Sequence, residues 1–505
     1  MKKLNLIKYF ICTGALMFSM ASCTDLEEQV LEGAQNGDAE SYLAGAYKGL
    51  RSLQGQGQTF AMGEVASDTY VVPTRGGDWG DGGAWRNFHA LTWDANSGEI
   101  NGAWNNLLSS VYYCDLVLQL GTVSAEKKAE ALFLKAFYYH IVLDYWGKAP
   151  YREAGADIND FPKVWNGVQA TTNIIAWLEE ALPNLPAKVA NKPHLANKDA
   201  ANFLLAKMYL NKAVFTDSDR QAPFTFSTAD MNKVIAHVDA ITNSSIAADI
   251  WDNYKPNNHA SPEVIFTSQN IQGQAMGDLR TRWYMSHHYN QTPGGWNGFS
   301  MVSEFYNRFS PNDRRVLNAD PAIIANFGNP VGVEKGQQYK PGGVEKVKDR
   351  NGVDLVFTPN IDTDLILDTN IENAGYRPMR YIPDANVDKP ENDYILMLYS
   401  DAVLMKAEAI LRGGTGTNNT AAISAMESRC APATVTFDLS TLNGIYKERG
   451  RELWGNGFRR TDMIRFGTFL NARELKTTVS NPKYLLYPVP ASALANPNIS
   501  QNPGY

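Results

Sequence analysis

The stretch AEALFLKAFYYHIVL (residues 129–143) gives the clearest evidence for the fold of this chain of 505 residues. Its mainly apolar stripe recurs at steps of three and four residues, namely at Leu132, Phe133, Ala136, Phe137, His140 and Leu143. That spacing places them along one face of an α-helix. Comparable patterns occupy residues 39–53, 100–120, 173–182, 200–214 and 399–411. The sequence therefore predicts a mostly α-helical protein.

Four of these predicted helices share a short spacing pattern: alanine, a large residue three positions later, and a second alanine two positions after that. The pattern occurs at Ala39-x-x-Tyr42-x-Ala44, Ala131-x-x-Leu134-x-Ala136, Ala201-x-x-Leu204-x-Ala206 and Ala402-x-x-Met405-x-Ala407. Alanines beside a large residue let two helices approach closely, which suits stacked helix pairs. Because the intervals are unequal, we expect a tetratricopeptide-like helical scaffold interrupted by insertions. Plain alanine-rich helices in a bundle are the alternative.

The middle of the chain, residues 215–392, has a different character. Gly, Pro and Asn are frequent at 251–262, 291–298 and 326–352, and short β-like runs occur at 263–267 and 353–358. These residues favour turns and loops. We therefore expect an irregular, loop-rich ligand-binding subdomain with short β-strands, inserted between an N-terminal helical part (23–214) and a C-terminal helical part (393–505).

The first 22 residues resemble a lipoprotein signal peptide. Lys2 and Lys3 precede a mainly apolar stretch that ends in Met20-Ala21-Ser22-Cys23. Small residues directly before a cysteine resemble a bacterial lipobox, in which Cys23 is acylated and becomes the first mature residue. An ordinary cleavage site beside a chance cysteine is the alternative. The acidic residues that follow Cys23 resemble a surface-export signal of Bacteroidetes lipoproteins, so we expect a lipid-anchored protein exposed at the outer membrane.

Composition and motifs exclude several function classes. With 46 Lys and Arg against 53 Asp and Glu, the net charge of −7 disfavours nucleic-acid binding. The sequence has no G-x-S-x-G, H-E-x-x-H or P-loop motif. Cys114 and Cys430 are expected to be buried apolar residues, and the adjacent His287 and His288 should point apart. The pairs Asp217/Asp219 and Asp362/Asp364 lack an EF-hand pattern, so we predict no metal, no cofactor and no catalytic residue.

A pair of glutamates, Glu448 and Glu452, lies four residues apart on a probable helix. Five arginines lie close by in sequence: Arg449, Arg451, Arg459, Arg460 and Arg465. Carboxylates among so many guanidinium groups stay ionised, which is the wrong state for a general acid. We therefore expect structural ion pairs here rather than a glycosidase site.

Two glycine-rich segments contain tryptophans whose side chains we expect to be partly exposed to solvent. The loop that spans 74–93 begins TRGGDWGDGGAW (74–85), and a second segment reads QTPGGWNG (291–298). An indole among glycines has few side chains to pack against, and an aromatic face suits the apolar C–H face of a sugar ring. Arg, Asp and Asn can bind the sugar hydroxyls. These considerations select Trp79, Trp85, Arg75 and Asp78 from the first segment, and Trp296 and Asn297 from the second. The alternative is that the tryptophans fold back to cover the core.

The C-terminal third resembles a known family. The stretch ERGRELWGNGFRRTDMIRFG (448–467) and the ending YPVP (487–490) with NPNISQNPGY (496–505) closely resemble the SusD/RagB family. The lipobox, the segment 131–150, the loop 295–298 followed by Phe305-Tyr306, and the tail occur in the family's order, so the resemblance covers essentially the whole mature chain. Two departures are Gly450, where a larger residue is usual, and Asn456, where Glu is common.

This resemblance implies a non-enzymatic outer-membrane lipoprotein that binds oligosaccharides as the lid of a SusC-like TonB-dependent β-barrel transporter. It also implies an arc of aromatic residues around the glycan, for which Trp296 and Trp79 are the nearest matches. Three residues compete for the tyrosine of that arc, namely Trp283, Tyr284 and Tyr289. The alternative function is a peptide-binding lid of a RagA-like peptide importer. Glycosidase activity is a third, less favoured hypothesis.

Overall fold

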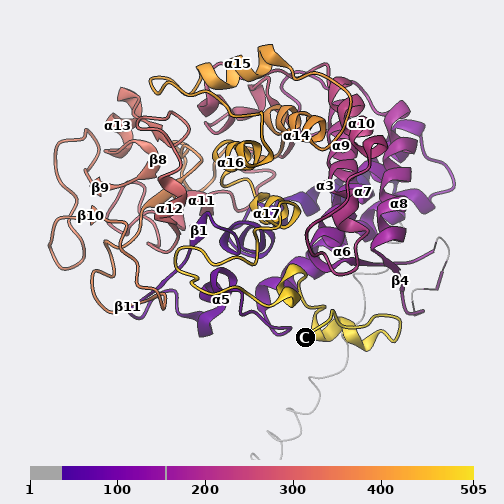
Figure 1. Ribbon diagram of the computed structural model, residues 1–505, viewed down its shortest axis with the longest axis horizontal. Helices are drawn as coiled ribbons and strands as arrows, with labels where there is room; N and C mark the ends of the chain where they lie inside the picture. The colour runs from indigo at the N-terminus through magenta and orange to yellow at the C-terminus, as the bar shows by residue number, and fades with distance from the viewer. Residues whose placement is uncertain (1–36, 154–155, 158) are drawn as a thin grey trace, which may run out of the picture.

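The computed structural model describes residues 37–153, 156–157 and 159–505. The predicted lipidation site, Cys23, lies outside these residues. The described chain is mostly helical, and its longer helices pack against one another in sequence order (Figure 1). They are α3 (Ala39–Gly49), α6 (Gly98–Gln119), α7 (Ala125–Trp146), α8 (Gly167–Ala181), α9 (Lys198–Phe215), α10 (Thr228–Asp239), α14 (Tyr399–Leu411), α15 (Thr420–Ser428), α16 (Leu442–Leu453) and α17 (Arg459–Arg465).

Local sequence explains where the central helix α7 begins and ends. The Ser124 side chain accepts a hydrogen bond from the Lys127 amide and caps its N-terminus. Gly147 ends it in a left-handed conformation, with φ of 68°. The helix packs against α6 on one side and α8 on the other, and nearly all of its last 18 residues are buried. The periodic stretch 129–143 is therefore a core helix, and the prediction of a mainly helical scaffold is confirmed.

The alanine pattern has the expected role in three of its four copies. Ala131, Ala136, Ala201, Ala206, Ala402 and Ala407 are all buried. In α3, however, Ala44 is exposed, and the buried small residue is Ala46. Close approach of α3 to α6 depends instead on Gly49, where a Cβ atom would lie 2.1 Å from the Ser110 hydroxyl. The buried face of α3 therefore includes Tyr42 of the pattern, but neither of its alanines.

The irregular part lies beside the helices, on the left in Figure 1. The helix α10 falls inside the segment 215–392 but packs on α9 and α14 as part of the helical stack. Short helices there are α11 (Thr281–Tyr284), α12 (Ser303–Tyr306) and α13 (Pro321–Phe327). The strands form small sheets, ordered β1-β6, β2-β11, β3-β4, β5-β13, β9-β10 and β7-β8-β12. Their bounds are β1 (Tyr70–Val71), β2 (Thr74–Arg75), β3 (Lys148–Tyr151), β4 (Lys163–Asn166), β5 (Val264–Ser268), β6 (Ser300–Met301), β7 (Leu317–Asn318), β8 (Val331–Glu334), β9 (Gly336–Gln337), β10 (Val356–Phe357), β11 (Ile366–Leu367), β12 (Arg377–Met379) and β13 (Tyr394–Leu398).

A buried ion-pair network joins α14, α16 and α17. Arg449 Nε lies 2.8 Å from Asp462 Oδ2, and its Nη1 lies 2.8 Å from Asp401 Oδ1. Arg465 contacts Asp462 at 2.7 Å and Glu408 at 2.7 Å. Burial alone would raise the pKa of Asp462, but the guanidinium groups of Arg449 and Arg465 outweigh it and hold the pKa well below its usual value. All of these side chains are at most 4 % exposed, so the charges are compensated by one another rather than by water.

Glu448 and Glu452 form ion pairs, as expected, but mainly with arginines distant in sequence. Arg315 pairs with Glu448, and Arg429 pairs with Glu452. Arg451, a neighbour in sequence, also contacts Glu448. The two departures from the family pattern fit this packing. A Cβ atom at Gly450 would lie 2.9 Å from the Arg459 guanidinium, and the Asn456 amide donates to the Tyr254 hydroxyl over 3.2 Å.

We predict that Asp462→Asn lowers the free energy of unfolding by roughly 3–5 kcal/mol, because it leaves two buried guanidinium groups with too little negative charge. Urea denaturation followed by circular dichroism measures this change. As a control, Glu180→Gln removes the exposed Lys128–Glu180 pair and should change stability little. Equal effects of the two substitutions would contradict the structural role of the buried network.

Candidate functional site

Strand pairing brings the two predicted aromatic loops together. Strand β1 pairs with β6, so that Tyr70 lies opposite Met301 and Val71 opposite Ser300. The loop that carries Trp79 follows β1, and the loop that carries Trp296 precedes β6. Trp79 Nε1 donates a hydrogen bond to the Trp296 carbonyl oxygen over 2.7 Å. Residues 217 positions apart in sequence therefore form one local surface.

Four aromatic residues at this surface form what we call the aromatic platform: Trp79, Tyr284, Tyr289 and Trp296. Trp296 is 38 % exposed, and the other three are half-buried. The rings of Tyr284 and Trp296 lie 5.5 Å apart between centroids. The predicted indoles are thus neither fully covered nor far apart, and at least one presents a substantial ring surface to solvent.

Trp79 is held in a strained backbone conformation. Its φ is 59°, in the left-handed region that bulky residues rarely adopt and that costs on the order of 1–2 kcal/mol. The indole packs on Gly298, where a Cβ atom would lie 2.2 Å from Trp79 Cε2. It also makes edge contacts with Trp85 at 5.5 Å and Phe299 at 5.6 Å. The hydrogen bond to Trp296 and this packing stabilise the strained orientation, a feature found often at binding sites.

Charged side chains surround the platform. The Tyr289 hydroxyl donates to Asp78 Oδ2 over 2.6 Å, and the Tyr284 hydroxyl donates to Asp388 Oδ1 over 2.8 Å. Arg350 lies over the Tyr289 ring, 4.2 Å from its centroid. Burial, followed by these bonds to carboxylates, raises the pKa of both tyrosines to about 12. Both hydroxyls therefore stay protonated, and the carboxylates keep free lone pairs for further donors.

Four residues selected from the sequence are buried instead. Trp283 is fully buried, and Arg75, Asn297 and Trp85 are 1 %, 1 % and 7 % exposed. Arg75 donates to the carbonyl oxygens of residues 298, 371 and 374, and Asn297 Oδ1 accepts from Arg377. Trp85 Nε1 donates to Asp81. Because they are buried, these four side chains have no face available for a ligand, which corrects the sequence-based selection.

The adjacent histidines brace the Trp296 loop. His287 Nδ1 lies 2.7 Å from the Pro293 carbonyl oxygen, and its Nε2 lies 3.3 Å from Glu334. His288 Nε2 contacts Glu372 over 2.7 Å, so the two rings do point to different carboxylates. Within the described residues, no group of three or more His, Cys, Asp or Glu side chains is arranged to hold a metal ion.

The sequence patterns do not identify three residues near the platform as site residues, namely Asp388, Arg350 and Glu372. Asp388 lies in the polar stretch PDANVDKPEN (383–392), and Arg350 lies in the charged stretch KVKDRNG (346–352). Such stretches normally indicate only a solvated loop, so no local signal identifies these residues. Their place beside the platform depends on contacts across more than 60 residues of sequence.

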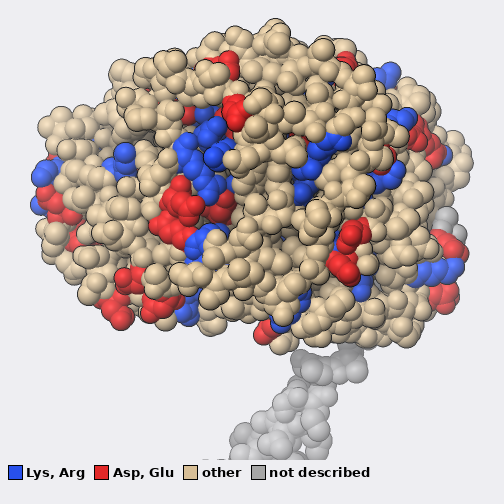
Figure 2. Space-filling model, in the orientation of Figure 1, with Lys and Arg blue, Asp and Glu red and all other residues tan. Residues whose placement is uncertain are grey.

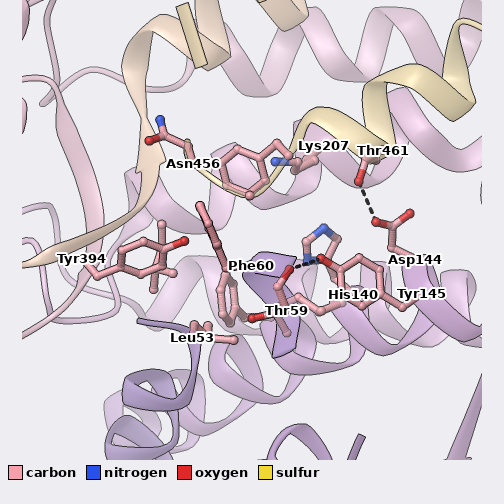
Figure 3. Close-up of a pocket in the computed structure, with 15 residues that line it drawn as sticks. Leu53, Thr59, Phe60, His140, Asp144, Tyr145, Lys207, Tyr394, Asn456 and Thr461 are labelled. Carbon is pink, nitrogen blue, oxygen red and sulfur yellow. Dashed lines mark hydrogen bonds between the residues drawn. The ribbon is translucent and has the colours of Figure 1, made fainter. Parts of the chain in front are cut away.

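A separate cavity lies among the helices (Figure 3). Its volume is about 60 Å³, and Phe60, His140, Lys207, Tyr394 and Asn456 are among its lining residues. The figure shows the Thr461 hydroxyl bonded to Asp144, and the Tyr145 hydroxyl bonded to the Thr59 carbonyl oxygen. This space suits a few water molecules and is too small for a sugar ring.

The sequence matches a known protein family. The model of the SusD family matches residues 239–505. The chain belongs to the SusD family. A second SusD-like model, described as "Starch-binding associating with outer membrane", matches residues 27–210. The starch-binding protein SusD of Bacteroides thetaiotaomicron is 27 % identical over 420 residues, which are 75 % of this chain and 73 % of that protein.

Solved structures of SusD-like proteins share the fold of this SusD-family chain. Surface glycan-binding protein A from Bacteroides fluxus has a TM-score of 0.68 at 18 % identity, over 92 % of this chain and 99 % of that one. Surface glycan-binding protein A from Bacteroides thetaiotaomicron, solved with laminarihexaose, has a TM-score of 0.65 at 17 % identity, over 92 % and 98 %. At this level of identity, the likeness concerns the fold.

We predict that the His287–Glu334 contact stabilises this SusD-family protein mainly below neutral pH. Burial lowers the pKa of His287, but the Glu334 carboxylate more than compensates and the net pKa is raised. The stabilisation is therefore complete below the unfolded pKa of about 6.5 and is lost as the pH rises through the folded value. Urea denaturation should show a larger difference between wild type and His287→Gln at pH 5.5 than at pH 9. A difference that does not depend on pH would contradict this ion pair.

Proposed function

We propose that this SusD-family protein binds oligosaccharides without catalysing their hydrolysis, and that the aromatic platform is the binding site. The observation that carries the proposal is the Trp79–Trp296 hydrogen bond, because it fixes the Trp79 indole to the backbone of the loop that carries Trp296, at one partly exposed surface. The relatives, a starch-binding protein and two surface glycan-binding proteins, support the same ligand class.

The chemistry of the platform suits a sugar. Indole and phenol faces of Trp296, Trp79 and Tyr284 match the apolar C–H face of a pyranose ring. Asp78 and Asp388 at the rim can accept hydrogen bonds from sugar hydroxyls while holding the two tyrosines in place. Each stacking contact contributes on the order of 1 kcal/mol, so several are needed for useful affinity.

We further propose that the protein is a lid of a SusC-like TonB-dependent β-barrel transporter, anchored in the outer membrane through a lipid at Cys23. The lipobox-like sequence before Cys23 supports the anchor, and the family description "associating with outer membrane" supports the location. Among the described residues, none of the helices combines the length and the hydropathy that crossing a membrane requires. Figure 2 shows one face of the molecule, on which acidic and basic side chains form groups separated by wide uncharged areas.

We predict that Trp296→Ala and Trp79→Ala each weaken binding of a recognised oligosaccharide about fivefold, the equivalent of one lost stacking contact. Affinity electrophoresis against a panel of polysaccharides identifies the ligand, and isothermal titration calorimetry measures the change. Trp79→Phe should lose less, because it keeps a ring but removes the donor to the Trp296 carbonyl.

The matched control is Tyr113→Ala, which removes an exposed aromatic ring from α6, outside the platform. It should leave glycan affinity unchanged. Calorimetry with mixed peptides tests the alternative role in peptide import through a RagA-like barrel. Binding of peptides but of no glycan would favour that alternative, and release of reducing ends by the purified protein would contradict a non-catalytic role.

We predict that Cys23→Ala moves the protein out of the membrane fraction, because acylation at this residue supplies the anchor. Immunoblotting of fractionated cells measures the change, and Cys114→Ala is the control because that thiol is buried in α6. Co-purification of a β-barrel with the wild-type protein in mild detergent tests the transporter partnership. Retention of Cys23→Ala in the membrane would contradict the lipid anchor.

A further inference from the structure

A surface hollow of about 480 Å³ lies where α14, α16 and α17 meet the loop 222–226. These helices gather near the middle of Figure 1, and none of the platform residues lines the hollow. Its walls include the half-buried rings of Phe224, Phe226, Tyr446 and Phe466. Its volume falls in the range of small-molecule sites, which are mostly apolar with a few placed polar groups.

One charged group, Arg412, packs against two of these rings. Its guanidinium carbon lies 3.9 Å from the Phe226 centroid and 4.9 Å from the Phe466 centroid. Phe466 in turn packs on Tyr446, with centroids 5.0 Å apart. The Arg412 side chain is only 8 % exposed. Contact with two aromatic rings restricts the guanidinium group, and Arg412 is one of the residues that line the hollow.

The terminal nitrogens of Arg412 lack a protein partner among the described residues. Its Nε donates to Glu408 Oε1 over 2.7 Å, but neither Nη atom makes a hydrogen bond there. Glu408 is already bound by Arg465, through Nε at 2.7 Å and Nη2 at 2.8 Å. Arg465 also donates through Nη2 to Asp462 and through Nη1 to Asn211. Of the two arginines that line the hollow, Arg412 is therefore the one whose two Nη atoms both lack a hydrogen-bond partner among the described residues.

The charged side chains around Arg412 carry a net positive charge. Four cations, Arg412, Arg449, Arg465 and Lys207, adjoin three carboxylates, Asp401, Glu408 and Asp462. One positive charge is thus in excess, and Arg412 is the cation lining the hollow whose two Nη atoms are both unbonded within the described residues. A carboxylate offers the planar pair of oxygens that such a pair of N–H donors binds best.

We propose that this hollow is a second binding site, which takes an organic carboxylate joined to a ring, either a sugar acid or an aromatic acid. Arg412 binds the carboxylate, and the rings of Phe226, Phe466 and Tyr446 contact the ligand ring. Asn443 and Thr468 line the same hollow and can bond hydroxyl groups. The site is independent of the aromatic platform and of the function proposed for it.

Ligand-observed NMR and calorimetry on the mature chain test this site, with glucuronate, benzoate, glucose and inorganic sulfate as probes. We expect saturable binding of glucuronate or benzoate and none of glucose. Glucuronate alone would identify a sugar-acid site, and benzoate alone an aromatic-acid site. Absence of saturable binding by either carboxylate, or sulfate binding as tight as theirs, would overturn the proposal.

Substitutions test whether the carboxylate binds in this hollow. Arg412→Gln should weaken carboxylate binding at least tenfold, and Arg412→Lys, which keeps the charge but not the paired donors, should weaken it severalfold. Lys447→Gln removes one exposed charge from α16, outside the hollow, and should have no effect. Phe226→Ser gives a second test that leaves the ion pairs intact. Unchanged affinity in Arg412→Gln and Phe226→Ser, with normal thermal unfolding, would refute the assignment.

Discussion

The buried pairing of arginines with carboxylates constrains the rest of this structure. A buried charge without a partner is strongly destabilising, so α14, α16 and α17 can pack only where their charges meet. The same requirement reaches the N-terminal half, because Arg459 Nε lies 2.7 Å from Asp68 Oδ1. Asp68 lies two residues before β1, the strand that pairs with β6 and places Trp79 beside Trp296. The C-terminal ion pairs thus help to fix the geometry of a surface formed by other parts of the chain.

Periodicity in the sequence predicts the helical scaffold well, because a buried helix face depends on local spacing. The stretch 129–143 lies within α7, and residues 399–411 coincide with α14. Ion-pair partners are less predictable, since they depend on which distant segments meet. Glu448 is followed directly by an arginine in sequence, yet Arg315, 133 residues away, is one of its main partners.

In the candidate site, too, local sequence predicts some features, whereas others depend on contacts between distant segments. In the glycine-rich segments, Trp296 is exposed, but Trp79 is half-buried against Gly298 and Phe299 and Trp85 is buried. Residue type alone does not rank the candidates. Trp283 and Tyr284 are neighbours on the single turn α11, and the structure buries the first while the second contacts Trp296. The rim residues Asp388 and Arg350 come from polar loops without any distinguishing pattern. Their position follows from tertiary contacts alone.

The hydrogen bond from the Trp79 indole to the Trp296 backbone has a consequence for recognition. Two flexible loops that had to be ordered separately on contact would each lose conformational entropy at that moment. Here much of that loss has already occurred during folding, along with the unfavourable backbone angle of Trp79. The Trp79 indole is therefore already ordered before the oligosaccharide that we propose would bind, which lowers the entropy cost of binding.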